Sequence, residues 1–280
     1  MLLLKRIGYV LNDYWIEIQD PRTANMALVN LQPSSIGLLL FAYYYFVTKA
    51  GPEIMKNRKP FELRREMFVY NATMVILNAF FFYHSISYCE YFRVFLNFNY
   101  PDRSDTSNEI VLAIKLGWWY WMSKFVDWID TIFYVLRKKT NHINFLHLYH
   151  HISVPLFGYL ILKINPLVPA AHLFIIINTL IHCFMYAYYA LAALGPNIRR
   201  YLWWKKYVTI MQLAQFLIGC VYGLIVFVNQ TGYPPIWLAI GLSQPPFFFY
   251  MFFRFYQRTY HKKNVSESQN SNLSSCIKTE

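Results

Sequence analysis

The chain contains apolar segments that are long enough to cross a membrane. Residues 211–228 read MQLAQFLIGCVYGLIVFV, which is 18 residues without a charged side chain. A helix of this length spans most of the bilayer's hydrocarbon core, which is about 30 Å thick. Similar apolar blocks occur at 36–47 and 74–88. A soluble domain can bury one such segment but not several, so the sequence predicts an all-α polytopic membrane protein.

The composition agrees with this fold class. Hydrophobic residues make up 56% of the chain and charged residues only 14%, against roughly 25% charged residues in soluble domains. The formal net charge is +12, but the basic residues are sorted by loop, so they indicate membrane topology and an anionic partner on one face, not nucleic acid. The cysteines show neither CxxC pairs nor even spacing, so we expect neither a zinc site nor a disulfide framework.

Seven transmembrane helices are predicted. Their ranges are 31–48, 67–88, 111–136, 142–162, 166–193, 207–228 and 233–253. Lys and Arg are frequent in the loops after the first, third and fifth spans and in the tail, and rare in the loops between. The positive-inside rule then places the basic loops and the C-terminus in the cytosol and the N-terminus in a lumen.

Three parts of the chain follow from this topology. Residues 1–30 form a lumenal N-terminal segment, and the start of the chain lacks the pattern of a cleaved signal peptide. Residues 31–253 form the seven-span domain. Residues 254–280 form a cytosolic tail, which is rich in Ser and Asn and predicted to be disordered.

The pentapeptide HLYHH places three imidazoles in one apolar, aromatic stretch. On a helix that turns by about 100° per residue, His147, His150 and His151 fall within an arc of about 100° and face the same way. A lone buried histidine is usually a structural residue. Ionisable groups inside a membrane span are costly, however, and mark functional sites by default. The three histidines are therefore the first candidates for an active site.

A second polar stripe follows in the segment NTLIHCFMYAYY. Its members recur at helical spacing and share one face: Asn178, His182, Met185, Tyr186 and Tyr189. An aromatic stripe alone normally indicates packing. An amide and an imidazole in the same stripe indicate instead a polar wall that faces the site.

The segment KFVDWIDT carries a lysine and two aspartates inside the third span. Lys124, Asp127 and Thr131 share one helix face, and Asp130 is offset from it. A Lys and an Asp one turn apart neutralise each other. A purely structural ion pair that holds helices together is therefore an open alternative to a role in the site.

Two amides lie in the segment TIMQLAQ of the sixth span. Gln212 and Gln215 point to one side of the helix. Buried amides commonly bridge membrane helices, so both a structural role and a place in the site are open for this pair.

Together these motifs resemble the ELO family, the fatty acid elongases of very-long-chain fatty acids. HLYHH matches the family's HxxHH box, KFVDWIDT looks like KxxExxDT, HCFMYAYY like HxxMYxYY, and TIMQLAQ like TxxQxxQ. Four motifs in the family's order over residues 124–215 make the resemblance specific, and the seven-span topology extends it over nearly the whole chain. One departure is Asp127, which stands where the family pattern has Glu and has a shorter reach.

The resemblance implies a fold and an activity. The fold is a barrel of six helices around a closed-ended acyl-CoA tunnel, with a seventh span alongside. The activity is that of a very-long-chain 3-oxoacyl-CoA synthase of the endoplasmic reticulum membrane. It condenses a long-chain acyl-CoA with malonyl-CoA to give a 3-oxoacyl-CoA two carbons longer, CO2 and CoA. No cofactor is implied. The implied partners are membrane lipid, the other enzymes of the elongation cycle and a second copy of the chain, and no nucleic acid.

We expect His150 to be the nucleophile, a choice among the three histidines that depends on the resemblance. Imidazole attacks thioesters at neutral pH and forms reactive acyl-imidazoles. His182 would orient the thioester or stabilise the enolate oxygen, and His147 and His151 would orient His150 or hold malonyl-CoA. Lys124, Asp127, Asp130 and Asn178 would hold the histidine tautomers and the geometry of the site. The supporting polar network would also include Thr131, Met185, Tyr186, Tyr189, Gln212 and Gln215.

The phosphates of CoA would meet basic residues on the cytosolic side. The candidates are Arg137, Lys138, Lys139, Lys205, Lys206, Arg254 and Arg258. Residues of this kind also set topology and contact lipid headgroups, so each is a candidate only. The acyl chain would lie among aromatic residues of the last three spans, such as FFFYMFF at 247–253.

Two other classes of protein remain open at this stage. Membrane desaturases and hydroxylases also use HxxHH, but they need several histidine boxes, and this chain has one. A single metal on His147, His150 and His151 is still possible, since neutral imidazoles are good ligands. The second class is a seven-span receptor or transporter, which fits the topology but gives no reason for three histidines that face a polar stripe.

Overall fold

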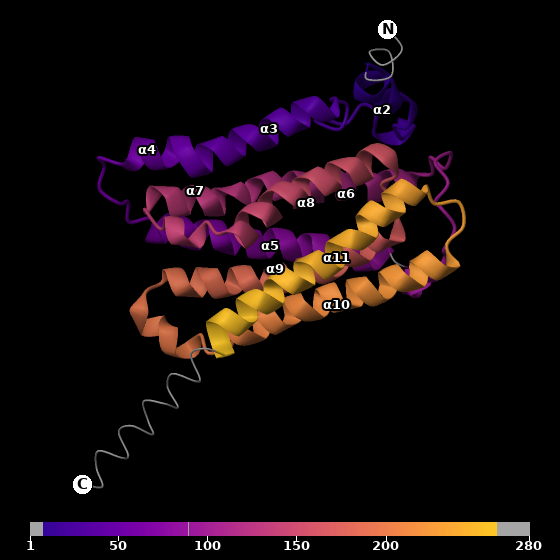
Figure 1. Cartoon of the computed structure of the whole chain (residues 1–280). Helices are drawn as coiled ribbons and strands as arrows, with labels where there is room; N and C mark the ends of the chain where they lie inside the picture. Colours follow the sequence, from indigo (N-terminus) through magenta and orange to yellow (C-terminus); the bar gives the residue numbers. More distant parts are fainter. Residues whose placement is uncertain (1–7, 89, 262–280) are drawn as a thin grey trace, which may run out of the picture.

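The computed structural model describes residues 8–88 and 90–261, and these form a bundle of long helices that run up and down beside one another (Figure 1). Within these ranges the chain forms no β-strand beyond one isolated bridge between Asn99 and Thr231. A short helix, α2 (Tyr14–Glu17), precedes the bundle. The helices of the bundle are α3 (Pro33–Tyr45), α4 (Gly51–Met55), α5 (Arg64–Tyr88), α6 (Asn108–Val126), α7 (Trp128–Leu136), α8 (Phe145–Ile164), α9 (Pro169–Ala193), α10 (Lys205–Asn229) and α11 (Pro235–Tyr256).

Five of these helices are long and apolar enough to cross a membrane, namely α5, α8, α9, α10 and α11. The chain is therefore a multi-pass membrane protein, as predicted. The first and third predicted spans are helical but interrupted. Helix α3 passes through a π-helical turn, Phe46–Ala50, into α4, and α6 ends at Val126, two residues before α7 begins. Membrane crossing by these two segments, the seven-span count and the closed six-helix barrel remain predictions.

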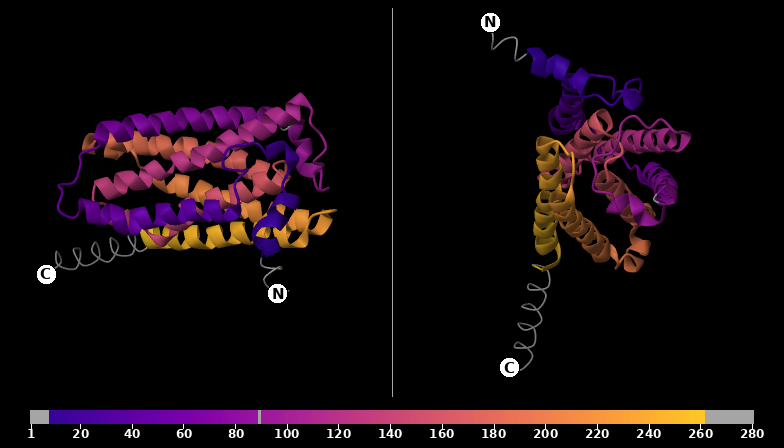
Figure 2. Two further views of the ribbon diagram at one scale, coloured as in Figure 1. Left: turned by 90° about the horizontal axis from the view of Figure 1, so that it is seen from above. Right: turned by 90° about the vertical axis from the view of Figure 1, so that its right-hand side faces the viewer.

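The loops alternate between the two ends of the bundle (Figures 1 and 2). Residues 56–63, 137–144 and 194–204 lie at one end, together with the end of α11; we call this the basic end. Helix α2 and the loops at 165–168 and 230–234 lie at the opposite end. The predicted sorting of the Lys and Arg residues is thus present in three dimensions. The assignment of the basic end to the cytosol remains a prediction.

The helices begin at residues that suit a helix start. Pro33, Pro169 and Pro235 occupy the first helical position of α3, α9 and α11, where proline loses no hydrogen bond because that N–H has no partner in a helix. Helix α8 begins after Asn144, whose side chain accepts a hydrogen bond from the backbone N–H of His147. This cap sets where α8 starts and hence which way its histidines face.

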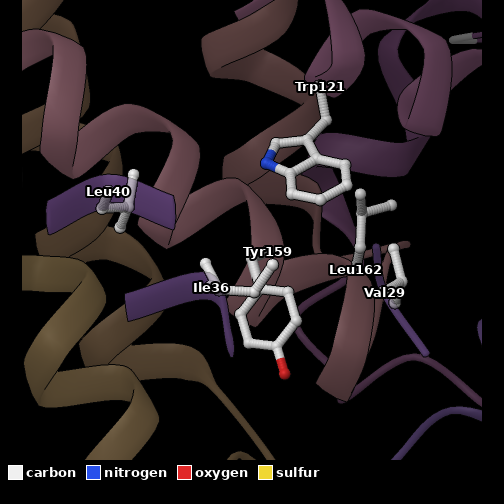
Figure 3. Packing of buried hydrophobic residues seen from close by; sticks show 6 residues of the cluster. All are labelled: Val29, Ile36, Leu40, Trp121, Tyr159 and Leu162. Carbon is white, nitrogen blue, oxygen red and sulfur yellow. The ribbon is translucent and has the colours of Figure 1, made fainter. Parts of the chain in front are cut away.

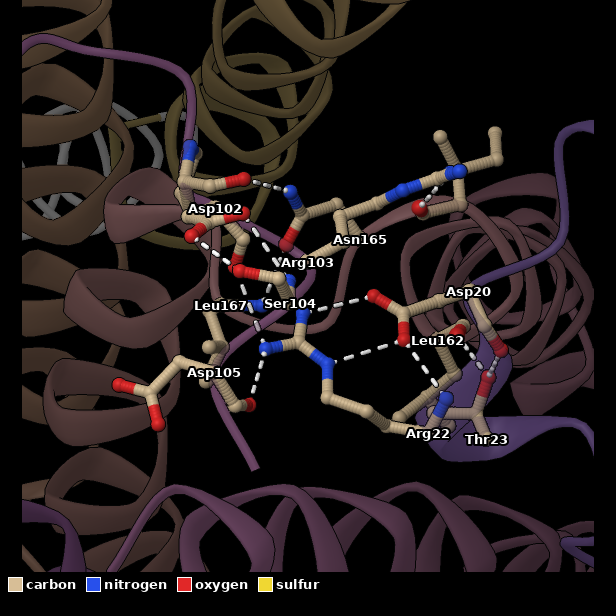
Figure 4. A network of polar contacts seen from close by, with 12 residues as sticks. Asp20, Arg22, Thr23, Asp102, Arg103, Ser104, Asp105, Leu162, Asn165 and Leu167 are labelled. Atoms are coloured by element: carbon tan, nitrogen blue, oxygen red, sulfur yellow. Dashed lines mark hydrogen bonds and ion pairs between the residues drawn. The ribbon is translucent and has the colours of Figure 1, made fainter. Parts of the chain in front are cut away.

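A polar network ties three separate segments together at the end opposite the basic end (Figure 4). Asp20 and Arg22 form a buried ion pair at 2.7 Å. The guanidinium of Arg22 also donates to the backbone carbonyls of Asp102 and Asp105, at 3.2 and 3.1 Å. The backbone N–H of Asp20 donates to the carbonyl of Lys163 at the end of α8. Through these contacts residues 20–23 are packed onto the bundle.

Beside this network an apolar cluster joins α3, α6, α8 and the segment before α3 (Figure 3). Its buried members are Val29, Ile36, Leu40, Trp121, Tyr159 and Leu162. Trp121 reaches α8 closely, and its indole N–H donates to the carbonyl of Pro155 at 2.8 Å. This approach requires glycine at 158, because a Cβ there would overlap the indole ring of Trp121.

The substitution Gly158→Ala tests this helix contact. We expect the overlap with buried Trp121 to lower the free energy of unfolding by about 1–3 kcal/mol, despite the better helix propensity of alanine. The matched control is Gly37→Ala in α3, where a Cβ meets nothing within 4 Å; it should be neutral or slightly stabilising. Thermal unfolding of both variants in detergent measures the difference, and equal midpoints would contradict the close packing of α6 against α8.

Candidate active site

Histidines from two helices converge inside the bundle. Helix α8 contributes His147, His150 and His151, and α9 contributes His182. The rings of His147 and His151 lie 4.2 Å apart between centroids, and those of His150 and His182 lie 6.3 Å apart. His151 and His182 are buried. The structure therefore brings together all four histidines that the sequence analysis selected.

Two of these imidazoles carry a ring nitrogen without a partner. Nδ1 of His150 and Nδ1 of His182 are buried and make no hydrogen bond to any residue in the described part of the chain. Buried polar atoms are nearly always paired, and an exception in a protein interior calls for a physical explanation. Two such nitrogens on facing helices are available to a ligand that enters between α8 and α9.

The ion pair expected in KFVDWIDT is present and buried. The ammonium of Lys124 lies 3.2 Å from a carboxylate oxygen of Asp127, and both side chains are at most 4% exposed. The hydroxyl of Tyr186, from α9, lies 3.1 Å from Asp127 and 3.0 Å from Asp130. Asp130 therefore joins the network, although we expected it to be offset. The helix is interrupted at Asp127, between α6 and α7, and the next carboxylate is three residues further, so both reach one tyrosine.

The amide of Asn178 extends the same network. Its oxygen accepts a hydrogen bond from Tyr120 at 2.8 Å, and the ammonium of Lys124 lies 4.5 Å above the Tyr120 ring. Within residues 8–88 and 90–261, the side-chain hydrogen bonds of Lys124, Asp127, Asp130 and Asn178 go to one another or to tyrosines. These contacts hold α6, α7 and α9 around the histidines, and a role of the four side chains in setting the histidine tautomers stays a prediction.

The residue that contacts a ring nitrogen of His147 is Thr131. Its hydroxyl lies 2.8 Å from Nε2 of His147 and 2.7 Å from the hydroxyl of Tyr43, a residue of α3. Thr131 is fully buried. This continuous chain of hydrogen bonds links α3 to the HLYHH histidines through α7.

A proline sets the backbone around His151. Pro155 lies inside α8 and has no N–H, so the carbonyl of His151 lacks its usual helical donor. The indole N–H of Trp128, on α7, donates to that carbonyl at 2.8 Å. The pairing satisfies a buried acceptor and holds α7 against the histidine turn of α8.

The stripes of α9 and α10 also meet. The amide of Gln212 lies 3.8 Å from the sulfur of Met185, and the ring of Tyr189 packs edge-on against Tyr186. Gln215 is buried, and its amide nitrogen makes no hydrogen bond with the rest of the described chain. Gln212 thus contacts the polar stripe of α9 directly. For Gln215, both the structural role and the place in the site remain predictions.

Aromatic side chains cover the apolar side of His150. The ring of Phe248, from the predicted FFFYMFF lining, lies 5.9 Å from the His150 ring and stacks on Phe216 at 5.2 Å. The neighbouring Tyr149 donates a hydrogen bond to Gln244 at 2.8 Å. Helices α8, α10 and α11 therefore meet beside the histidines through large side chains.

A cavity lies further along the bundle, toward the end opposite the basic end. Its wall comes from α5, α6, α9 and the turn before α9, and it is lined by Phe81, His84, Ser85, Tyr88, Ala113, Leu116, Gly117, Tyr120, Pro166, Leu167, His172 and Ile175. Tyr120 separates this cavity from Lys124 and Asn178, since it contacts both. A single side chain, that of Tyr120, thus lies between the cavity and the polar site.

The CoA-binding candidates lie at the basic end. Lys139, Lys205, Lys206, Arg254 and Arg258 are exposed there, whereas Lys138 donates to the backbone carbonyl of Lys56. Partial burial and the positive charges of Lys205, Lys139 and Arg137 keep the pKa of His142 below its usual value. Basic side chains from two separate loops therefore gather around one point, which is suited to an anion.

Three aromatic residues that hold the site were not among the predicted site residues. Tyr43, Tyr120 and Trp128 each pair with a motif residue or its backbone. Nothing in the sequence distinguishes them from the many other aromatic residues of the chain, because their partners come from other helices. Only Trp128 lies inside a motif, where the pattern leaves its position unspecified.

The arrangement of possible metal ligands bears on the alternative classes. In the described part of the chain, no three His, Cys, Asp or Glu side chains are grouped so that they would hold a metal ion. His84 and His172 line the cavity, and His142 is at the basic end. Cys183 and Cys220 are free thiols, and Cys89 and Cys276 lie outside the described residues.

Comparison with known proteins decides the family. The family model of the ELO proteins, described as the GNS1/SUR4 family, matches residues 28–268, which is most of the chain. The chain belongs to the ELO family.

Named relatives of this ELO protein agree over nearly its full length. It is 37% identical to very long chain fatty acid elongase 7 of Drosophila melanogaster, over 90% of this chain and 77% of the relative. It is 36% identical to very long chain fatty acid elongase 7 of Rattus norvegicus, over 89% of both chains. It is 33% identical to very long chain fatty acid elongase 5 of Xenopus laevis, over 95% of this chain and 89% of the relative.

The Trp128 contact gives a test of the local structure of the site. We expect Trp128→Phe to leave the buried carbonyl of His151 unpaired and to lower the free energy of unfolding by about 1–3 kcal/mol. Adding Pro155→Ala restores a backbone N–H at the helical position and should recover part of that loss. Thermal unfolding in detergent of the two single variants and the double variant measures the coupling.

The control for the change of ring size is Trp119→Phe, because Trp119 is 58% exposed. This variant should unfold at nearly the wild-type temperature. A double variant no more stable than Trp128→Phe alone would contradict the proposed pairing of the indole with the His151 carbonyl.

Proposed function

We propose that this ELO protein is the condensing enzyme of fatty acid elongation, a very-long-chain 3-oxoacyl-CoA synthase. It joins a long-chain acyl-CoA to malonyl-CoA and releases CO2 and CoA. The observation that carries the proposal is the pair of facing imidazoles, His150 and His182, each with a buried nitrogen that no neighbouring residue occupies. Membership of a family whose relatives are named fatty acid elongases supports the same reaction class.

In this mechanism a ring nitrogen of His150 attacks the thioester carbonyl of the acyl-CoA. The carbon–sulfur bond breaks, the CoA thiolate takes the proton from the other ring nitrogen, and a neutral acyl-imidazole remains. Free CoA then leaves and malonyl-CoA enters. Acyl-imidazoles are reactive acyl donors, so the intermediate is competent for the second step.

The second step forms the new carbon–carbon bond. Malonyl-CoA loses CO2, and the resulting enolate carbon attacks the acyl-imidazole carbonyl. The carbon–nitrogen bond breaks and the imidazole regains a proton, ultimately from water. His182, on the facing helix, is positioned in this scheme to donate to the enolate oxygen. The ion pair of Lys124 and Asp127, with Tyr186, maintains the spacing of α6, α7 and α9 around the two histidines.

The substrates enter from the basic end in this proposal. Exposed Lys139, Lys205, Lys206 and Arg254 meet the CoA phosphates, and Lys138 contributes less because it is already bound to a backbone carbonyl. The basic end faces the cytosol and the N-terminus faces the lumen of the endoplasmic reticulum. No cofactor takes part, and a second copy of the chain and the other elongation enzymes are the expected protein partners.

The acyl chain extends from His150 toward the opposite end in this scheme. The cavity between α5, α6 and α9 lies in that direction and is mostly apolar. We place the methyl end of the longest substrates there, with Tyr120 at its entrance. The depth of this cavity then limits the length of the product.

The substitution His150→Ala tests the mechanism. We expect condensation to fall by roughly a thousandfold or more, because the nucleophile is lost. Purified protein in detergent receives labelled malonyl-CoA and a panel of saturated and unsaturated acyl-CoAs, and mass spectrometry reads the 3-oxoacyl products. His261→Ala, at the end of the π-helical segment Gln257–His261 beyond α11, serves as the matched control. Full activity of His150→Ala in a folded sample would exclude His150 as the nucleophile.

The same sample separates this proposal from the metalloenzyme alternative. Metal analysis of active protein should give no stoichiometric iron, and chelators should leave condensation unchanged. A desaturase or hydroxylase would instead contain bound metal and give oxidised acyl products without incorporation of labelled malonyl carbon.

The substitution Gly117→Leu tests the place of the acyl chain. Gly117 lines the cavity, and a Cβ there meets nothing within 4 Å, so a larger side chain at this position points new volume toward the cavity. We expect the longest product to become at least one elongation step shorter, with short substrates converted normally. Gly37→Leu, on the exposed side of α3, is the matched control. Unchanged product lengths would contradict the placement of the chain in this cavity.

A further inference from the structure

Tyr43 lies on α3, at the edge of the bundle in the end-on view (Figure 2, right), yet its side chain is only 6% exposed. The next two residues are also tyrosines, and they are 45% and 53% exposed. Helix α3 thus directs one of three consecutive tyrosines inward. The inward ring stacks on the indole of Trp128 with centroids 4.2 Å apart.

The hydroxyl of Tyr43 makes one hydrogen bond among the described residues, to Oγ1 of Thr131 at 2.7 Å. The same Oγ1 lies 2.8 Å from Nε2 of His147. Each hydroxyl has one proton to donate, and each neutral imidazole nitrogen either donates or accepts. The direction of the chain of hydrogen bonds therefore determines the tautomer of His147.

Only one direction pairs both hydroxyl protons. When Tyr43 donates to Thr131, Thr131 donates to Nε2 of His147, and the histidine carries its proton on Nδ1. In the reverse direction, His147 donates to Thr131 and Thr131 donates to Tyr43, whose own proton then has no acceptor among the described residues. An unpaired buried donor is costly, so the first direction is favoured.

Ring contacts connect His147 to the other two histidines of α8. His147 packs against His151 at 4.2 Å, and His151 packs edge-on against His150 at 5.4 Å. Trp128, on which Tyr43 stacks, also donates to the His151 carbonyl. Tyr43 thus contacts both residues that hold the histidine turn of α8, Thr131 and Trp128.

We propose that Tyr43 is a positioning residue of the active site, which holds His147 as the Nδ1–H tautomer through Thr131. It does not touch the substrate. Its role in turnover rests on the proposed condensing function, but its effect on the tautomer does not. Helix α3 is therefore part of the catalytic apparatus of this protein and not only a membrane anchor.

The direct test reads the tautomer by NMR of full-length protein labelled with ¹⁵N-histidine in detergent. The signal is assigned with His147→Gln. We expect the Nδ1–H form of His147 in the wild type and in Tyr44→Phe, and a mixture of tautomers in Tyr43→Phe. The two variants make the same substitution at neighbouring tyrosines, one buried and one exposed. An Nε2–H form in the wild type, or an unchanged tautomer in Tyr43→Phe, would overturn the proposal.

The kinetic test uses the same variants. We expect Tyr43→Phe to lower kcat about five- to tenfold, the effect of losing one hydrogen bond, with little change in KM for the acyl-CoA. Tyr44→Phe should match the wild type. Because both act through the same chain of hydrogen bonds, Tyr43→Phe should add little to the loss already caused by Thr131→Val. Fully additive losses would contradict the relay.

The two readouts keep the proposals separate. A tautomer that changes in Tyr43→Phe, in a protein that carries out no condensation, would refute the proposed function and leave this inference intact. Condensation by the wild type with a tautomer independent of Tyr43 would refute this inference alone. Equal thermal unfolding of Tyr43→Phe and Tyr44→Phe rules out a merely structural effect on kcat; a kcat loss matched by a loss of folded protein would count against the positioning role.

Discussion

Buried charge is the constraint on which the rest of this structure depends. Lys124 and Asp127 are inside a helical bundle that sits in an apolar medium, where an unpaired charge is strongly unfavourable. The ammonium is balanced by one carboxylate, and the hydroxyl of Tyr186 reaches both Asp127 and Asp130. These contacts join α6, α7 and α9. That arrangement holds α9, which carries His182, and the hydrogen bond from Trp121 to Pro155 holds α8, which carries His150, against α6.

Among the described residues, the buried polar atoms without a partner include one nitrogen on each of two neighbouring histidines. At the end opposite the basic end, Asp20, Arg22 and the backbone around them are paired throughout. Near the histidines, Nδ1 of His150 and Nδ1 of His182 have no protein partner. Other buried polar atoms of the described residues also lack a partner, for example in Gln19, Asn71 and Gln215, but the two imidazole nitrogens come from rings 6.3 Å apart on adjacent helices. This proximity is what makes the pair suited to a shared ligand.

Aromatic residues have two roles in this protein. Phe216 and Phe248 offer apolar surface beside His150. Tyr43, Tyr120 and Trp128 use their polar atoms and donate to, or share a proton with, groups of the site. Tyrosine and tryptophan suit this position because most of the side chain is apolar and one atom forms a hydrogen bond. The high aromatic content thus supports the site as well as the membrane-embedded surface.

The sequence by itself determined the membrane class, the helical ranges, the family and the four histidines that meet. Apolar length, charge sorting and helical spacing are local properties, and they are visible in one dimension. Tertiary structure alone decided which side chains serve those histidines. Thr131 holds His147, Asp130 reaches Tyr186, and Tyr43 enters from a helix 88 residues away in sequence from its partner Thr131. Helical spacing gives the direction of a side chain from its own axis, but the partner depends on how other helices pack, which no local pattern encodes.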